Sequence, residues 1–522
     1  MKRSSLRFPF ALLLLAAAAR AADPPEQPAP SESTRRVTYV PESVKNEIRE
    51  EIKKEVLEQA KREGWAAPDV VPSWVQRFKM SGDARVRFER DIFARGNANT
   101  GDFPDFNAIN TNKPFDRNFV DPANERYLNV DQNRTRFRLK ARLGTVADIG
   151  SGFSAELRLA SGDTNTPVST SQTLGATGGV FSKYQVWIDR VAIRYQALNG
   201  ALAVQLGRFE NPFFGTVLLW SQEINFDGLA VQGAVQATES LRPFWVAGAF
   251  PIFTSAFAFP AEQPDKFRSQ NKWLYAAQLG TEWKASSSFA LKIAASFYDF
   301  DKVEGRFSDP CFTNLSFVSC SSDETRPSFA QKGNTYFPIR VPNDTAIALG
   351  NAGAPEYQFF GLASRFRELV ATARLELKVS EALAFTLDGE YVHNAGFNRG
   401  QVANLPVVNN RGPSNDASSL GPYAGGNNGT FGRLSLGSGS LRRRWDWQAG
   451  VSYRYLQSDA VLDALNDPDF GLGGTNLKGY SLDATLAVFE GVYAIARWMS
   501  ANQIIGPKYG VDVLQIDLYA RF

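Results

Sequence analysis

The chain has 522 residues, a formal net charge of +3 at pH 7 and an aromatic content of 12%. So small a net charge argues against a nucleic-acid partner, and two cysteines in the whole chain exclude a scaffold held mainly by disulfides. The length exceeds that of an ordinary soluble domain, yet no linker is evident after residue 75. A large closed barrel can use such a length without a linker.

Residues 1–21 have the pattern of a secretory signal peptide. Three cations precede an apolar core over residues 8–19, and a small-residue cleavage pattern ends at Ala21. The core is too short for a spanning helix, and no later stretch offers the roughly 18 consecutive apolar residues that one needs. The sequence therefore predicts an exported protein that no helix holds in a bilayer.

Residues 22–40 are rich in Pro, Glu and Ser, which predicts a flexible leader. Residues 41–64 then predict one amphipathic helix on the periplasmic side, with Pro41 in its first turn and Gly64 as its stop. Its apolar residues recur every four positions, which departs from a strict heptad. A solvated helix, a short oligomerising coil and a periplasmic contact all remain open for this segment.

Residues 76–522 show a different pattern, in which apolar and polar side chains alternate as in β-strands. We count sixteen such runs, near residues 77–90, 132–146, 152–162, 185–197, 200–209, 226–236, 242–250, 272–283, 288–300, 369–380, 383–393, 430–438, 444–456, 480–490, 491–500 and 511–522. Short turns alternate with long polar connections, the latter near residues 91–131, 161–183, 303–360 and 394–430. Short turns on one rim and long loops on the other are typical of an outer-membrane barrel. We therefore expect an all-β transmembrane barrel of about sixteen antiparallel strands, with both ends of the barrel on the short-turn side.

The stretch 133–144 carries a cation at every second position: Arg134, Arg136, Arg138, Lys140 and Arg142. On a strand these side chains share one face, whereas Phe137, Leu139 and Leu143 share the other. A cation at the lipid midplane costs about 2–4 kcal/mol, so the five cations are expected to line the lumen. Arg85 and Arg87 are expected to join them from the preceding run.

Two interpretations of this cationic ladder stay open. It could raise the local concentration of anions, as charge rings do in pores. Alternatively, Asp83 and Glu89 on the preceding strand and Glu156 on the next could pair with it across the sheet, so that it only braces the wall.

The connection near residues 209–226 is unusually apolar for an outer loop. Such a segment would not stay in water, so we expect it to fold into the barrel as a constriction loop. Trp220 belongs to its apolar part, and Glu210, Glu223 and Asp227 could face the cations across the opening. The alternative is that part of this run continues the flanking strands.

The remaining candidate residues are few. Cys311 and Cys320 lie in one predicted outer loop and are expected to form a local disulfide. His393 would be the base of a serine hydrolase if the barrel were an enzyme, but no motif flanks it. The acidic residues at 466–469 are the kind that bind calcium, but no ligand spacing supports such a site. We therefore expect no enzyme activity, no cofactor and no metal.

Four segments together resemble a porin family of Gram-negative outer membranes. They are the helical segment with its extension (PESVKNEIREEIKKEVLEQAKREGWAAP), GRFENPFF at 207–214, LLWSQEINFDGLAVQG at 218–233 and SYRYLQSDAVLDALNDPDFGLGGTN at 452–476. The resemblance implies a barrel of sixteen or so strands in the cell outer membrane that lets small hydrophilic solutes diffuse passively. The alternative is a structural barrel that anchors the N-terminal helix to the cell wall or to neighbouring subunits.

The partners follow from the same reasoning. Outer-membrane lipid is expected around the wall, and a homotrimer is left open as the assembly. The final run ends in Phe522, which resembles the signal read by the bacterial barrel-assembly machinery. Ala520 departs from that signal, which usually prefers an aromatic residue there.

Overall fold

The structure is a computed structural model that describes residues 51–52, 55, 75–121, 125–162, 166–176, 178–255, 267–351, 353–380, 382–414 and 421–522. The predicted signal peptide and leader lie outside these residues. Within the predicted helix 41–64, the described residues Glu51, Ile52 and Glu55 are helical, and the rest lies outside the described part. The chain divides into two units, Met1–Pro72 and Ser73–Phe522, and the strands described here belong to the second.

Sixteen long antiparallel strands close into a barrel, which confirms the predicted fold class. One strand falls in each of the sixteen predicted runs. The strands are β1 (Phe78–Phe93), β3 (Arg134–Gly150), β4 (Phe153–Ser161), β6 (Val186–Ala197), β7 (Leu202–Glu210), β8 (Asn225–Ala234), β9 (Leu241–Phe253), β10 (Lys272–Lys284), β11 (Phe289–Asp301), β17 (Phe366–Lys378), β18 (Ala384–Asn394), β19 (Asn428–Gly437), β20 (Trp447–Leu456), β21 (Leu477–Phe489), β22 (Val492–Gln503) and β23 (Gly510–Arg521). Closure is made by β1, which pairs with β3 on one side and with β23 on the other.

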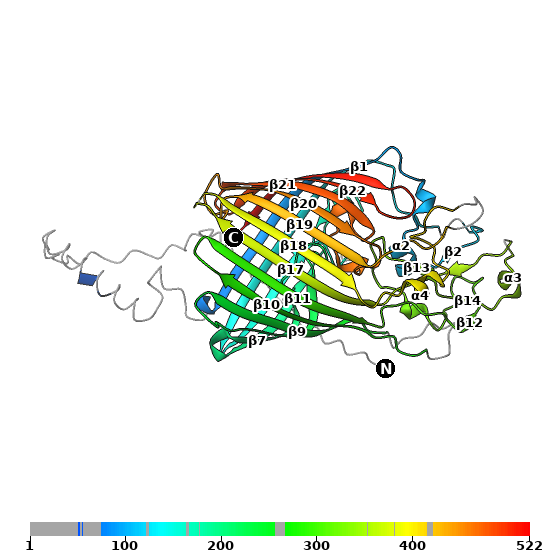
Figure 1. Cartoon of the computed structure of the whole chain (residues 1–522), viewed down its shortest axis with the longest axis horizontal. Helices are drawn as coiled ribbons and strands as arrows, with labels where there is room; N and C mark the ends of the chain where they lie inside the picture. The colour runs from blue at the N-terminus through cyan, green and yellow to red at the C-terminus, as the bar shows by residue number, and fades with distance from the viewer. Residues whose placement is uncertain are drawn as a thin grey trace, which may run out of the picture. The chain divides into compact units, whose positions relative to one another are not determined.

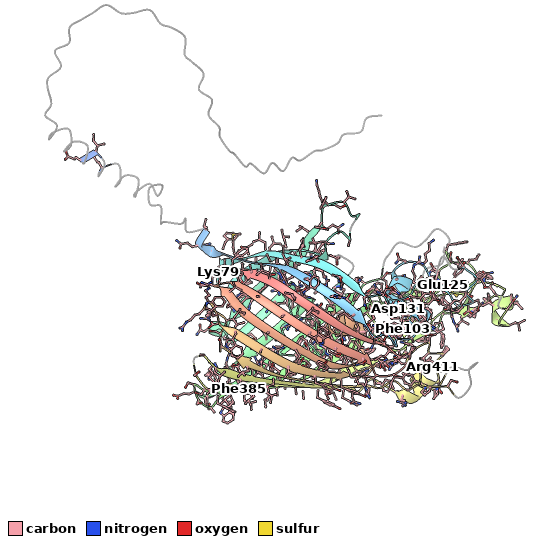
Figure 2. The ribbon with its side chains drawn as sticks, turned by 90° about the horizontal axis from the view of Figure 1, so that it is seen from above. Lys79, Phe103, Glu125, Asp131, Phe385 and Arg411 are labelled. Atoms are coloured by element: carbon pink, nitrogen blue, oxygen red, sulfur yellow. A yellow bond between two sulfur atoms is a disulfide. The ribbon has the colours of Figure 1, made fainter. Side chains whose placement is uncertain are left out.

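The long connections gather at one end of the barrel, as Figure 1 shows. In Figure 2, Phe103, Glu125 and Arg411 lie at this loop end, whereas Lys79 and Phe385 lie at the turn end. Short elements stiffen the connections: α2 (Phe106–Thr111), α3 (Thr345–Ala348), α4 (Arg399–Ala403), β2 (Phe115–Asp116), β5 (Gln172–Thr173), β12 (Pro310–Cys311), β13 (Tyr336–Pro338), β14 (Val341–Pro342), β15 (Tyr357–Gln358) and β16 (Phe360–Leu362). Among the described residues, no helix is long and apolar enough to cross a membrane.

The two faces of each strand differ in exposure because the loop end of the lumen is filled. In β17, Phe366 is buried and Val370 is 5% exposed, whereas Leu369 on the opposite face is 49% exposed. Buried aromatic side chains of the connections, such as Tyr336 and Phe337, pack in the same cluster as Phe366. The outward face is therefore an apolar band, and the inward face supports a core made by the loops.

Turn chemistry explains the tight hairpin between β6 and β7. Leu198, Asn199 and Gly200 take positive φ values of 53°, 55° and 88° in succession. This left-handed conformation costs little for glycine and asparagine and more for leucine. The predicted short turn at 198–200 is therefore a three-residue reversal in which two residues, Asn199 and Gly200, suit the left-handed backbone.

Candidate functional site

The five cations of β3 face acidic side chains, most of them on β1. The antiparallel register sets Arg142 opposite Asp83, Arg138 opposite Arg87 and Arg134 opposite Asp91. The resulting contacts are Arg134–Asp91 (3.0 Å), Arg136–Glu89, Arg138–Glu89 (3.3 Å), Lys140–Glu223 (2.9 Å) and Arg142–Asp83 (2.7 Å). The opposite face of β3 is apolar and open, with Phe137 54% exposed. The ladder therefore points inward and is compensated by acids along its whole length.

One expected pairing is wrong. Glu156 does not contact the ladder but lies 3.3 Å from Arg190 Nη1 on β6. The reason is register, since Glu156 stands opposite Val146, beyond the last cation of the ladder.

Arg87 is the most deeply buried member of the cationic set, with 1% of its surface exposed. Its Nε and Nη2 atoms donate to the two carboxylate oxygens of Asp517 on β23, at 2.7 and 2.9 Å. Its Nη1 atom donates to Asp469 Oδ2 at 2.9 Å. Such a bidentate pair is among the strongest hydrogen-bonded contacts in proteins. Arg87 therefore ties the closing strands together and is not itself open to solvent.

The predicted constriction loop is the connection 211–224 between β7 and β8, and it is held against the inner wall. The Phe214 backbone exchanges hydrogen bonds with Gln278 on β10, at 2.9 and 2.7 Å. The Thr216 amide and hydroxyl donate to Glu390 on β18. Trp220 is 4% exposed and packs edge-on against Phe226, with ring centroids 5.0 Å apart. The loop is therefore fixed at several points rather than hanging free.

Only part of the predicted constriction set meets the ladder. Glu223 does so, accepting from Lys140 Nζ at 2.9 Å and from the Thr170 amide at 2.7 Å. Glu210 and Asp227 belong to the ends of β7 and β8, and they pair with Arg190 (3.0 Å) and Arg208 (2.8 Å). The predicted range 209–226 was too wide, because β7 extends to Glu210 and β8 already begins at Asn225.

A second connection, 457–476 between β20 and β21, also folds inward, which was not predicted. Asp467 lies 3.3 Å from Arg454 Nη2, and Asp469 pairs with Arg87 and with Arg497 (3.5 Å). The Leu465 carbonyl accepts from the Ser221 amide, so the two inserted connections touch. The acids considered for calcium thus face guanidinium groups. The acidic stretch NDPD at 466–469 suggested a charged site, but its arginine partners could not be read from the sequence.

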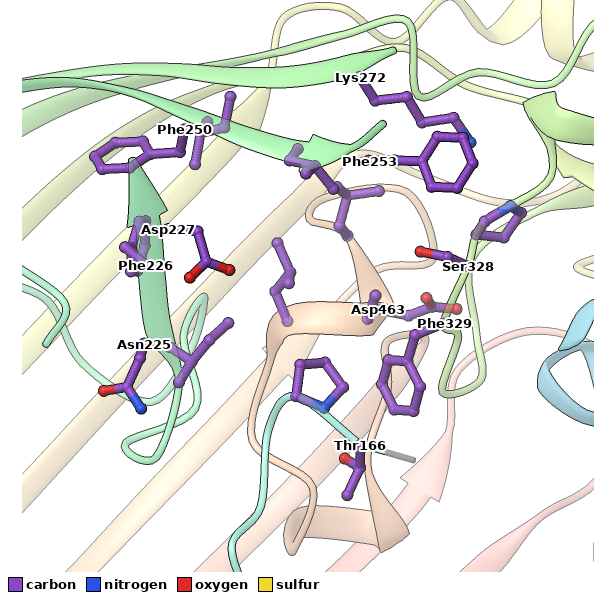
Figure 3. Close-up of a pocket in the computed structure, with 18 of the residues that line it drawn as sticks. Thr166, Asn225, Phe226, Asp227, Phe250, Phe253, Lys272, Ser328, Phe329 and Asp463 are labelled. Atoms are coloured by element: carbon purple, nitrogen blue, oxygen red, sulfur yellow. The ribbon is translucent and has the colours of Figure 1, made fainter. Parts of the chain in front are cut away.

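Two cavities follow the lumen, one on each side of the inserted connection 211–224. We call the one at the loop end, of about 930 Å³, the vestibule, and the one nearer the turn end, of about 700 Å³, the chamber. Four residues line both cavities: Ser169, Trp220, Glu223 and Ile224. Figure 3 shows the vestibule with the Asp227 carboxylate pointing into it. The two spaces therefore adjoin at the inserted connection, and we call these four shared residues the junction.

Glu223 keeps its charge at this junction. Burial alone would raise the pKa of its carboxyl, but Lys140, Arg85 and the hydrogen bond from Thr170 together lower that pKa to about 2. The carboxylate therefore stays ionised over the physiological range. Protonation of this group cannot open or close the junction near neutral pH.

The ion pairs of the chamber wall differ in which partner is exposed, and in Arg454–Asp467 it is the acid (3% against 18%). In three other ion pairs that line the chamber, the arginine is the more exposed partner: Arg374 over Asp388 (42% against 8%), Arg433 over Asp483 (28% against 11%) and Arg497 over Asp469 (32% against 17%). Of the seven cations predicted to line the pore, Arg85 is the member that lines the chamber. The exposed arginines of these three pairs lie on strands β17, β19 and β22 and not on the ladder.

The other candidate residues lie outside this site. His393 Nδ1 is 2.9 Å from Asn428 Oδ1. Cys311 and Cys320 form a disulfide in the connection between β11 and β17, with Cα atoms 5.9 Å apart. The described residues contain no group of three or more acidic, histidine or cysteine side chains suited to a metal ion.

Cysteine labelling checks the orientation of the ladder. We expect Arg138→Cys to react with a water-soluble thiol reagent in intact vesicles, because position 138 faces the lumen. Leu139→Cys should not react, because it faces lipid. The disulfide leaves no free native thiol among the described residues. The reverse labelling pattern would mean that the register of β3 is wrong by one residue.

Comparison with known proteins gives one family and several barrels. A family model described as "Putative porin" matches residues 11–522. One similar solved structure is the outer membrane channel DcaP of Acinetobacter baumannii, with 8% sequence identity, a TM-score of 0.38 and a match that covers 86% of this chain and 98% of that chain. Another is OprB of Pseudomonas putida at high pH, with 11% identity, a TM-score of 0.41 and coverage of 86% of this chain and 95% of that chain. A third is OmpF of Salmonella typhi in complex with daunomycin, with 8% identity, a TM-score of 0.36 and coverage of 85% of this chain and 97% of that chain. No curated protein matches.

Proposed function

The chain belongs to this porin family, and from that premise we propose that it lets small hydrophilic solutes diffuse passively across the outer membrane, with a preference for anions. The closed barrel and the two cavities that meet inside it support passive diffusion. The outward apolar band, of which Leu279 is 69% exposed, suits contact with outer-membrane lipid.

The exposed arginines of the chamber carry the anion preference. A permeating ion meets the guanidinium groups of Arg374, Arg433 and Arg497 before the carboxylates behind them. These three pairs therefore present positive charge to the chamber, although each pair is neutral as a sum. Charge that lines a pore selects ions of the opposite sign, and salt weakens the selection by screening.

Conductance in planar bilayers tests the proposal. The purified protein should form channels whose reversal potential in a KCl gradient indicates chloride preference, and the preference should fall as salt rises. Replacing Arg374, Arg433 and Arg497 together by Gln should remove most of it. A protein that inserts but does not conduct would instead favour the structural barrel. A conducting channel that prefers cations would contradict the anion preference alone.

We also predict that β23 contacts the barrel-assembly machinery and that the protein forms a homotrimer. Cross-linking of the protein in its native membrane separates monomer from trimer directly.

A further inference from the structure

The vestibule has the size and lining of a ligand site. Its volume of about 930 Å³ lies within the roughly 300–1,000 Å³ typical of small-molecule pockets. Aromatic and aliphatic side chains form much of its wall, among them Trp187, Ile252, Phe253 and Phe329. A solute that passes the loop end meets this space before it meets the constriction.

One ion pair in this wall has unused hydrogen-bonding capacity. Arg208 on β7 donates from Nη1 to Asp227 Oδ2 on β8 at 2.8 Å, and from Nε to the Asp189 carbonyl at 3.0 Å. Arg208 Nη2 and Asp227 Oδ1 have no hydrogen-bond partner among the described residues. Asp227 is 52% exposed and Arg208 is half-buried at 32%. The pair thus offers one free donor and one free acceptor side by side.

The backbone beneath this pair is specialised. Gly207 and Gly228 stand opposite each other, one residue before and one residue after the paired side chains. Their φ values are 121° and 139°, and a Cβ atom would lie 2.3 Å from the Val191 carbonyl oxygen on β6 at Gly207 and 2.3 Å from the Ala249 carbonyl oxygen on β9 at Gly228. Residues with a side chain rarely adopt this conformation. The two glycines therefore allow the strands to present Arg208 and Asp227 as they do.

The other charged groups of the vestibule are already satisfied. Lys272 Nζ donates to the Thr325 and Arg326 carbonyls and lies over the Phe253 ring. Asp189 binds Arg158, and Asp463 accepts from the Tyr336 hydroxyl at 3.0 Å. Glu223 is held by Lys140. The polar atoms of these groups are thus engaged by the protein, which leaves Arg208 and Asp227 as the pair with unused hydrogen-bonding capacity.

We propose that the vestibule binds an uncharged, hydroxyl-bearing ring solute of the carbohydrate class. A sugar hydroxyl can donate to Asp227 Oδ1 while its neighbour accepts from Arg208 Nη2, so it satisfies both members of a net neutral pair. An anion or a cation would be attracted by one member and repelled by the other. The apolar face of the ring packs on the aromatic wall, and Ser328 and Thr166, which Figure 3 shows on the far sides of the cavity, supply further hydroxyl groups.

Single-channel recording with maltose tests this site. Maltose added on the loop side should interrupt the current reversibly, with a dissociation constant that rises at least tenfold in Asp227→Asn and in Arg208→Gln. Arg117→Gln is the matched control, because Arg117 pairs with Glu356 on the surface of the connections and lies outside the vestibule lining. Equal block in all four proteins would overturn the proposal, and so would stronger block by gluconate than by maltose.

A second measurement does not require conduction, so the two proposals can fail separately. In Ser328→Cys, maltose should slow labelling by a water-soluble thiol reagent several-fold. Asn351→Cys, on an exposed residue away from the vestibule, should label at the same rate with and without maltose. Absence of protection at position 328 at maltose concentrations up to 100 mM would overturn the proposal, whether or not the channel conducts.

Discussion

Replacing Arg87 by Met is expected to lower the free energy of unfolding of the barrel by about 3–5 kcal/mol, because it leaves buried carboxylates without their partner. Asp517 loses two hydrogen bonds and Asp469 loses one. The midpoint of urea unfolding, followed by the mobility difference between folded and unfolded barrel on a gel, measures the loss. Removing the second partner as well, in Arg87→Met with Asp517→Leu, should recover part of it.

The matched control for this variant is Arg242→Met. Arg242 also pairs across strands, with Glu282 at 3.4 Å, but its side chain is 54% exposed. An exposed pair contributes about 0–1 kcal/mol, so the urea midpoint should hardly move. Equal shifts in the two variants would show that the seam between β1 and β23 gains nothing special from its buried pair.

Replacing Arg136, Arg138 and Lys140 together by Gln should move the reversal potential strongly toward cation preference without closing the channel. The variant loses three positive charges, which leaves Glu89 with only Arg87 (3.7 Å) and Glu223 with only Arg85 (3.9 Å) as cationic neighbours. Their field then attracts cations, most clearly at low salt. Reversal potentials in KCl gradients, measured for channels that still show folded mobility on a gel, give the result.

Two further variants fix the sign of this effect. Glu223→Gln should move the reversal potential the opposite way, toward anions, because it frees Lys140 and Arg85. Removing three cations from the outer connection instead, by Lys113→Gln, Arg117→Gln and Arg126→Gln, should cause a smaller shift. If the ladder variant keeps the parent potential at low salt, the ladder only braces the wall.

The strands could be predicted because their signal is local. A period of two is visible within a dozen residues, and five cations in one stretch can face lipid only at a high cost. The inward direction of Arg134 to Arg142 therefore followed from the sequence, as did the inward fold of the apolar connection around Trp220. The disulfide was expected from two cysteines nine residues apart.

The partners of the charges could not be predicted, because they depend on register and on distant segments. Arg87 meets Asp517 across 430 positions of sequence. Glu156 missed the ladder by register alone, and Asp227 was expected to face the ladder but pairs with Arg208 on β7. The inward course of 457–476 had no local signal, since its acidic and glycine-rich text also suits an exposed loop. The vestibule is assembled from many connections and is visible only when they are folded.

The pairing of β1 with β23 also sets the order of events in folding. The two strands join the beginning and the end of the sheet, so their hydrogen bonds require every intervening hairpin to be in place. Contacts of such long range form slowly. Until then the sheet has two open edges, whose unpaired amide and carbonyl groups lipid cannot satisfy. Completion of this seam should therefore be the late, rate-limiting step of folding, and an incomplete sheet would be the species most exposed to misassembly.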